Sequence, residues 1–130
     1  MSNNSKTTTQ EILKKRGKAS RRRGFAYERK IVNELKEITG DNDLCTSRSE
    51  SKRLDDMKID VADPNHTLKF YVQIKCTQQT PAIDKLNREV GKKDLPLCIF
   101  WNIQEMKEQK QISKGEYVII PKKFFYDLIK

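Results

Sequence analysis

From residue 24 onward the apolar residues of the chain recur with the period of an α-helix. The stripe, at roughly 100° per residue, consists of Tyr27, Ile31, Leu35 and Ile38, with Val32 at its edge. Gly40 comes directly after this stripe and suits the left-handed position at which many helices end. The pattern therefore predicts a helix over residues 24–39 that buries one of its faces.

The middle of the chain alternates between apolar and polar residues. In residues 68–76 every second residue is apolar, which predicts a strand with one buried face. Gln73 and Lys75 would then lie side by side on the polar face. Other segments predict strands at 44–48, 59–62, 97–101 and 117–120, a helix that begins with Thr80 and Pro81, and a terminal helix from Pro121. This order predicts an α/β domain with a central mixed β-sheet flanked by helices.

Positive charge is concentrated at the start of the chain. The 130 residues, enough for one domain, include 27 Lys and Arg against 18 Asp and Glu, a net charge of +9. Residues 14–23 contain seven of the basic residues and no acid. Because such a run repels itself and cannot be buried, we expect residues 1–23 to form a flexible basic arm before a domain over residues 24–130. Its natural partner is a polyanion, although a solubilising tail or a localisation signal would have a similar composition.

The composition disfavours several classes of protein. No apolar run approaches the roughly 20 residues that cross a bilayer, and the first residues lack the apolar segment of a signal peptide. We therefore expect no membrane partner and a cytoplasmic location. His66 is the only histidine, and Cys45, Cys76 and Cys98 form no CxxC pair. A metal ion would need oxygen ligands, which favours Mg²⁺, Ca²⁺ or Mn²⁺ over Zn²⁺.

Three charged residues occupy unusual positions in this pattern. Glu28 falls inside the apolar arc of the first helix, where an acid rarely lies without a partner. Asp60 stands between Ile59 and Val61 in a short apolar strand, so we expect its side chain to alternate off the core face. With Lys75, these acids could hold a divalent cation while the lysine orients or activates a water. Ordinary surface ion pairing among the three residues is the alternative.

The segments that carry these residues resemble archaeal and phage Holliday-junction resolvases. Residues 22–32, Arg-Arg-Gly-Phe-Ala-Tyr-Glu-Arg-Lys-Ile-Val, are similar to the opening helix of that family, which starts with basic-Gly-x-x-x-Glu-Arg. Ile59-Asp60-Val61 and Val72-Gln73-Ile74-Lys75 resemble its PD-(D/E)xK nuclease core. The polar loop 48–52 lies where these resolvases keep a serine-containing loop. Segments 95–100 and 117–120 are similar to phage members, so the likeness spans residues 22–130.

The resemblance implies a restriction endonuclease-like nuclease core that cleaves DNA with one or two Mg²⁺ ions, for which Mn²⁺ can substitute. Its substrate would be the four-way junction, cut symmetrically, and two symmetric cuts favour a homodimer. The implied metal ligands are Asp60, Gln73, Glu28 and the backbone carbonyl of Ile74. The small size and lysine-rich composition would suit a phage-encoded protein that acts in a host cell.

Further roles follow from the same resemblance. Lys75 would position or activate the attacking water. Ser49 is the best match to the loop serine, with Ser47 and Ser51 as rivals. The expected DNA contacts are Arg21, Arg22, Arg23, Arg29, Arg48 and Lys52.

One position departs from the pattern of the family. Gln73 stands where the family has Glu or Asp, and an amide oxygen can ligate Mg²⁺ but brings no negative charge. We therefore expect weaker metal binding, with Asp55, Asp56 and Asp63 as alternative acids nearby. Two other functions stay open: an endonuclease with the same core that cuts other DNA structures, and a nuclease-like DNA-binding protein without catalysis.

Overall fold

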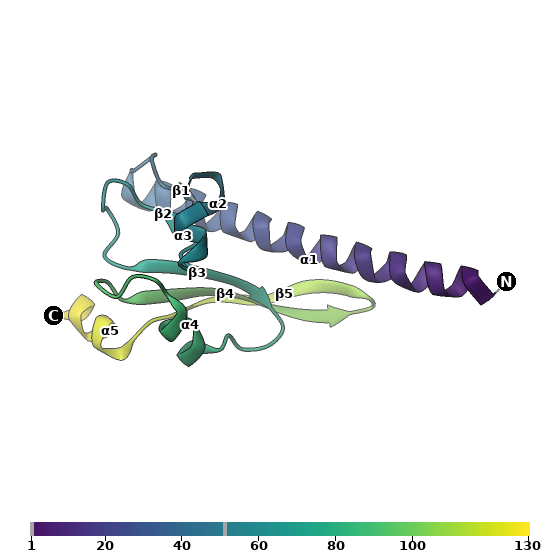
Figure 1. Cartoon of the computed structure of the whole chain (residues 1–130). Coiled ribbons are helices and arrows are strands. Elements are labelled where there is room, and N and C mark those ends of the chain that lie inside the picture. Colours follow the sequence, from purple (N-terminus) through teal and green to yellow (C-terminus); the bar gives the residue numbers. More distant parts are fainter. Residues whose placement is uncertain (1, 51) are drawn as a thin grey trace.

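The computed structural model describes residues 2–50 and 52–130, except for the side chains of residues 2–9, 12, 13, 16, 49, 50, 52 and 55. Its elements are α1 (Ser2–Thr39), β1 (Cys45–Thr46), α2 (Ser47–Glu50), α3 (Lys52–Asp56), β2 (Val61–Ala62), β3 (Tyr71–Thr77), α4 (Ile83–Glu89), β4 (Leu97–Lys107), β5 (Lys110–Ile119) and α5 (Lys122–Ile129). Figure 1 shows α1 on one side of the β3–β4–β5 sheet and α4 on the other. The predicted α/β class with a mixed sheet flanked by helices is confirmed.

The main sheet has the order β3–β4–β5, with β3 parallel to β4 and β4 antiparallel to β5. The segments 44–48 and 59–62 were predicted to join this sheet, and that prediction is wrong. Their extended parts, β1 and β2, pair with each other in a separate two-stranded sheet. One backbone bond, from the Asp60 N–H to the Val72 carbonyl at 2.8 Å, connects this small sheet to β3. The chain therefore leaves β3 after a single residue of pairing.

The apolar stripe of α1 packs against β3 as predicted. Tyr27, Ile31, Val32 and Leu35 are buried in one cluster with Val72 and Ile74. Ile38 is 80% exposed, so its predicted burial is wrong, because neither core cluster extends to that turn of the helix. Gly40, at φ +75°, ends the helix and donates its N–H to the Lys36 carbonyl.

The basic N-terminal segment is helical and continuous with the predicted helix. α1 begins at Ser2 rather than near Gly24, and its N-terminal half extends beyond the core in Figure 1. Lys and Arg are good helix formers, so a helix anchored on the core at Tyr27 continues backward through them. The boundary predicted at residues 23 and 24 coincides with no element boundary, and the flexibility of the basic segment stays a prediction.

A second core cluster lies on the opposite face of the sheet. Leu86 and Val90, from α4 and its end, pack there with Ile59, Leu97 and Ile99. The helix α4 begins at Ile83 with Ala82 at its N-cap, and no side chain caps it, so the predicted start at Thr80 and Pro81 is two residues early. Among the described residues, no helix is long and apolar enough to span a membrane.

Candidate functional site at the open edge of β3

Asp60 forms hydrogen bonds with the open edge of β3, just before the chain turns away into β2. Its N–H donates to the Val72 carbonyl at 2.8 Å, and its carboxylate Oδ2 accepts the Ile74 N–H at 2.6 Å. Along a strand the N–H and C=O of one residue point to the same edge, so the Ile74 carbonyl also points to this side. The Asp60 carboxylate therefore lies against the backbone between Gln73 and Lys75.

The path of the chain around Asp60 differs from the predicted alternation. Ile59 packs in the cluster on the α4 face, whereas Val61 packs in the cluster on the α1 face. Two neighbours buried on opposite sides of the sheet leave Asp60 directed along the sheet edge rather than onto the polar face. Lys58, with φ 62°, provides the turn that precedes this segment. The prediction that the Asp60 side chain alternates off a single core face is wrong for this reason.

Gln73 and Lys75 lie on one face of β3, as predicted. Both line a groove of about 580 Å³ that faces α4. The Gln73 side chain is 6% exposed, and its Oε1 has no hydrogen-bond partner among the described residues. The charged residues that line the groove are Lys58, Lys75, Lys85 and Glu89. A buried amide oxygen without a partner, beside an excess of lysines, is an arrangement suited to a cation and a phosphate together.

Glu28 faces the body of the protein as predicted, and the structure supplies the partner that its position requires. Its side chain is 15% exposed, and its Oε2 accepts two hydrogen bonds from Arg48, from Nη2 at 2.6 Å and from Nε at 3.1 Å. The Arg48 guanidinium also lies 3.3 Å above the centre of the Phe25 ring. Arg48 was predicted to contact DNA, and in the structure it holds Glu28. Any contact of Arg48 with DNA stays a prediction.

Ser47 connects the two acids. Its N–H donates to the Asp60 carbonyl at 2.9 Å, and the next residue is Arg48, which binds Glu28. The side chain is 1% exposed, and its Oγ has no partner among the described residues. Ser47 was a rival to Ser49 as the loop serine. The side chains of Ser49 and Lys52, and the whole of Ser51, lie outside the described residues.

The remaining predicted DNA contacts lie on α1. Arg21 and Arg22 are exposed, as is Arg29 one turn before the buried Val32. Arg23 is half-buried and donates to the Ser20 hydroxyl at 3.0 Å. None of these four guanidinium groups lines the groove beside Gln73 and Lys75.

The oxygen atoms at the β3 edge suit a hard divalent cation. The Ile74 carbonyl and the buried Gln73 amide oxygen come from β3, the Asp60 carboxylate hydrogen-bonds to the same strand, and oxygen donors are the ligands of Mg²⁺. Within the described part of the chain, no three His, Cys, Asp or Glu residues gather at a possible metal site. A cation here would therefore depend on the Asp60 carboxylate and neutral oxygens, and the Glu28 carboxylate is hydrogen-bonded to Arg48.

Comparison of the chain with protein-family models, with curated proteins and with solved structures found no match of any kind.

Sequence reasoning missed two features of this site. The Glu28–Arg48 pair joins residues 20 positions apart, and no local pattern signals which of many cations an acid will meet. The separation of Ile59 and Val61 onto different faces was also missed, because alternation holds only where a strand stays paired on both sides of the residue.

Proposed function

We propose that the chain is a Mg²⁺-dependent endonuclease with a restriction endonuclease-like core that resolves branched DNA, in particular four-way junctions. The observation that carries the proposal is the position of the Asp60 carboxylate on the open edge of β3, against the backbone between Gln73 and Lys75. The resemblance of residues 22–130 to junction resolvases names the same residues independently of their geometry. A functional origin of the unpartnered Gln73 oxygen would also explain why the fold tolerates its burial.

Asp60, Gln73 and the Ile74 carbonyl would hold the metal. A bound Mg²⁺ offsets charge on the phosphate and makes water a better nucleophile at neutral pH. Lys75, which lines the same groove as Gln73, donates hydrogen bonds that orient the attacking water beside the phosphate. Arg48 occupies Oε2 of Glu28, so Oε1 is the oxygen of that carboxylate that can accept a proton from a water molecule.

Binding of DNA would rest on two basic surfaces. The groove beside Gln73 contains Lys58, Lys75 and Lys85 against one acid, Glu89. The exposed side chains of Lys14, Lys15, Lys18, Arg21 and Arg22 form a second surface along α1. Each phosphate contact releases counterions, so we expect affinity to fall steeply with salt. Symmetric cutting of a junction needs two such sites related by a two-fold axis, and the proposal therefore includes a homodimer.

The deciding experiment is a cleavage assay on an immobile four-way junction and on a linear duplex of matched sequence, each with Mg²⁺ and with EDTA. Paired symmetric nicks on the junction alone, and only with the metal, are the expected result. If flaps, nicks or linear duplex were cut with metal as fast as the junction, the nuclease activity would be supported, but the four-way junction would be rejected as the preferred substrate. A matched assay with Mn²⁺ tests the expected substitution of the metal.

A second candidate function is DNA binding without catalysis. Gln73 in place of an acid, and the lack of a three-residue acidic or histidine cluster in the described residues, favour it. This candidate predicts salt-sensitive binding of junctions with no product at any Mg²⁺ or Mn²⁺ concentration. If Gln73→Glu then cut DNA, the missing negative charge at this position would be the reason why the wild-type protein does not.

A further inference from the structure

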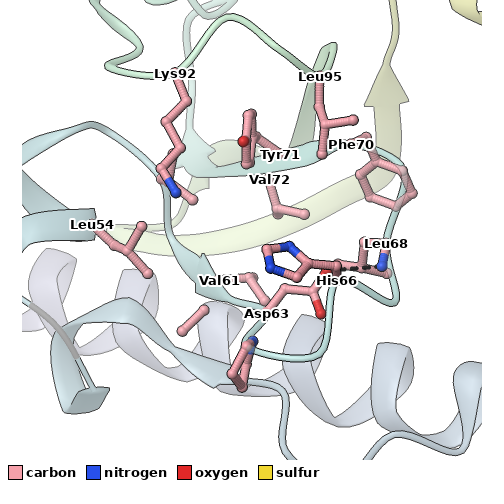
Figure 2. A pocket seen from close by; sticks show the side chains of 13 residues that line it. Leu54, Val61, Asp63, His66, Leu68, Phe70, Tyr71, Val72, Lys92 and Leu95 are labelled. Atoms are coloured by element: carbon pink, nitrogen blue, oxygen red, sulfur yellow. Dashed lines mark hydrogen bonds between the residues drawn. The ribbon is translucent and has the colours of Figure 1, made fainter.

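A cavity of about 300 Å³ lies next to the candidate site, between the two core clusters. Figure 2 shows the side chains that line it. Its apolar wall consists of Leu54, Ile59, Val61, Leu68, Phe70 and Val72. Ile59 and Val61 are the two sequence neighbours of Asp60, the acid of the candidate site. Its volume is about twice the 150 Å³ that suffices for a benzene ring.

The lining of the cavity includes Lys92, His66 and the acid Asp63. The Tyr71 hydroxyl, and after it the charges of Lys92 and His66, lower the pKa of the neighbouring Asp94. Asp63 accepts the N–H groups of Thr67 and Leu68 at 2.9 Å and 2.8 Å. Asp94 accepts the Tyr71 hydroxyl at 2.6 Å. The amine of Lys92 lies 5.8 Å from the centre of the Tyr71 ring, and among the described residues it takes part in no salt bridge. A cation in the lining of an apolar cavity suits a ligand with a flat apolar body and an anionic end.

His66 is held in place by an unusual backbone conformation. Its φ of 53° lies in the left-handed region, and its N–H donates to the Asp63 carbonyl at 3.2 Å. Non-glycine residues in this region are uncommon, and the Asp63–Asn65 turn fixes the conformation here. Figure 2 shows the imidazole ring beside Val61 and Val72, over the cavity. With Phe70 and Tyr71 in the same lining, the cavity offers aromatic surfaces to a planar group.

We propose that this cavity binds the base of an unstacked nucleotide whose phosphate meets Lys92. The apolar wall and the rings of His66, Phe70 and Tyr71 would receive the base, because aromatic stacking accepts any nucleobase. The inference rests on the proposed function in one respect: the nucleotide in question would neighbour the phosphate beside the metal that Asp60 would hold. Bases at a branch point are easier to unstack than bases inside a duplex, so the pocket would favour branched DNA.

The first arm of the test uses a four-way junction with 2-aminopurine next to the branch point, in EDTA so that no cleavage occurs. Saturating wild-type protein is expected to raise the fluorescence of 2-aminopurine several-fold as the base leaves the stack. Ala62→Leu, which fills the cavity, should abolish the rise, and Lys92→Gln should weaken it. Lys69→Gln, which removes an exposed lysine outside the cavity, should match the wild type. Thermal melts of each variant confirm that it is folded.

The second arm titrates a free deoxynucleoside monophosphate and follows backbone amide shifts of residues 59–72. Amide shifts that the nucleotide causes in the wild type but not in Lys92→Gln, together with no fluorescence rise in DNA, would show that the cavity binds a free nucleotide rather than a base of DNA. Flat fluorescence at saturated DNA binding together with unchanged amide shifts would overturn the proposal. A fluorescence rise in a protein that never cuts DNA would reject the catalytic function while leaving the pocket supported, so the two failures are distinguishable.

Discussion

Two adjacent residues of β3, Ile74 and Gln73, are buried to the same extent on opposite faces of the strand. Each is 6% exposed. Ile74 packs in the apolar cluster under α1, whereas the Gln73 amide oxygen has no hydrogen-bond partner among the described residues. Burial of an apolar side chain stabilises the fold, but an unsatisfied buried oxygen costs about 1–3 kcal/mol. Equal burial therefore indicates packing on one face and a candidate ligand position on the other.

The largest expected effect is on the packed face. Ile74→Ala should lower the free energy of unfolding by about 2–5 kcal/mol, because it removes a buried side chain from a close-packed cluster. Chemical denaturation measures this loss. Ile83→Ala, at a position that is 40% exposed on α4, is the matched control and should cost much less. Similar losses at the two positions would show that the cluster under α1 is not the core of the domain.

Asp60→Asn should reduce cleavage of a junction by about a hundredfold or more, because the negative charge at the β3 edge is removed where it would hold the metal. The asparagine oxygen can still accept the Ile74 N–H, so the fold and the binding of DNA should persist. Single-turnover cleavage and binding isotherms separate the two effects. Asp127→Asn, at an exposed acid on α5, should cut at the wild-type rate. Wild-type cutting by Asp60→Asn would reject the site.

Gln73→Met should raise the free energy of unfolding by about 1 kcal/mol, since an apolar side chain of similar length replaces the unpartnered oxygen. The same variant should need more Mg²⁺ for half-maximal cleavage. Gln73→Glu should need less, because it adds a negative charge at the ligand position. A Gln73→Met protein that is less stable than the wild type, with an unchanged Mg²⁺ requirement, would contradict the account of this face.

The smallest effect concerns Tyr71, on the same face as Gln73. Burial, together with its hydrogen bond to Asp94, raises the pKa of Tyr71 to about 12. The same bond lowers the pKa of Asp94 below its ordinary value of 3.8. A carboxyl with a depressed folded pKa stabilises the protein above its unfolded pKa, and this contribution is lost as the pH falls through the folded pKa.

Tyr71→Phe should therefore raise the pKa of Asp94 toward its ordinary value and reduce the loss of stability on acidification below about pH 4. An NMR titration of the Asp94 carboxyl measures the first effect, and melts across this pH range measure the second. An unchanged pKa in the variant would show that the hydroxyl is not the cause of the shift.

Local pattern was sufficient for the elements with long, regular periodicity. The helical stripe from Tyr27 to Leu35 predicted a helix and its buried face, because the pattern depends on neighbours in the sequence. The alternation over residues 68–76 predicted a strand and the face that packs under α1, but the strand begins at Tyr71, and Gln73 on the other face is also buried. Ile38 did not follow the pattern, since burial requires a partner surface as well as the right angular position. The start of α1 at Ser2 was missed because charge repulsion was weighed above the helix propensity of Lys and Arg.

The candidate site was predictable in its residues and not in its geometry. Gln73 and Lys75 were placed together correctly from strand alternation alone. The hydrogen bond from the Ile74 N–H to the Asp60 carboxylate forms because the chain pairs with β3 at Asp60 and then turns away into β2. No pattern in residues 59–62 predicts this turn. The ion pair between Arg48 and Glu28 likewise depends on tertiary structure, because Arg48 is placed by the two-residue strand β1 and the short helix α2 that follows it.

The central claim is that the open edge of β3 binds a divalent cation, and paramagnetic relaxation by Mn²⁺ tests it most directly. At substoichiometric Mn²⁺, the amide signals of Asp60, Ile74 and Lys75 should lose intensity first, and this loss should disappear in Asp60→Asn but persist in Asp127→Asn. Broadening centred instead on Asp41 and Asp43, which share a hydrogen bond donor in Asn65, would contradict the account. So would identical broadening in the wild type and in Asp60→Asn.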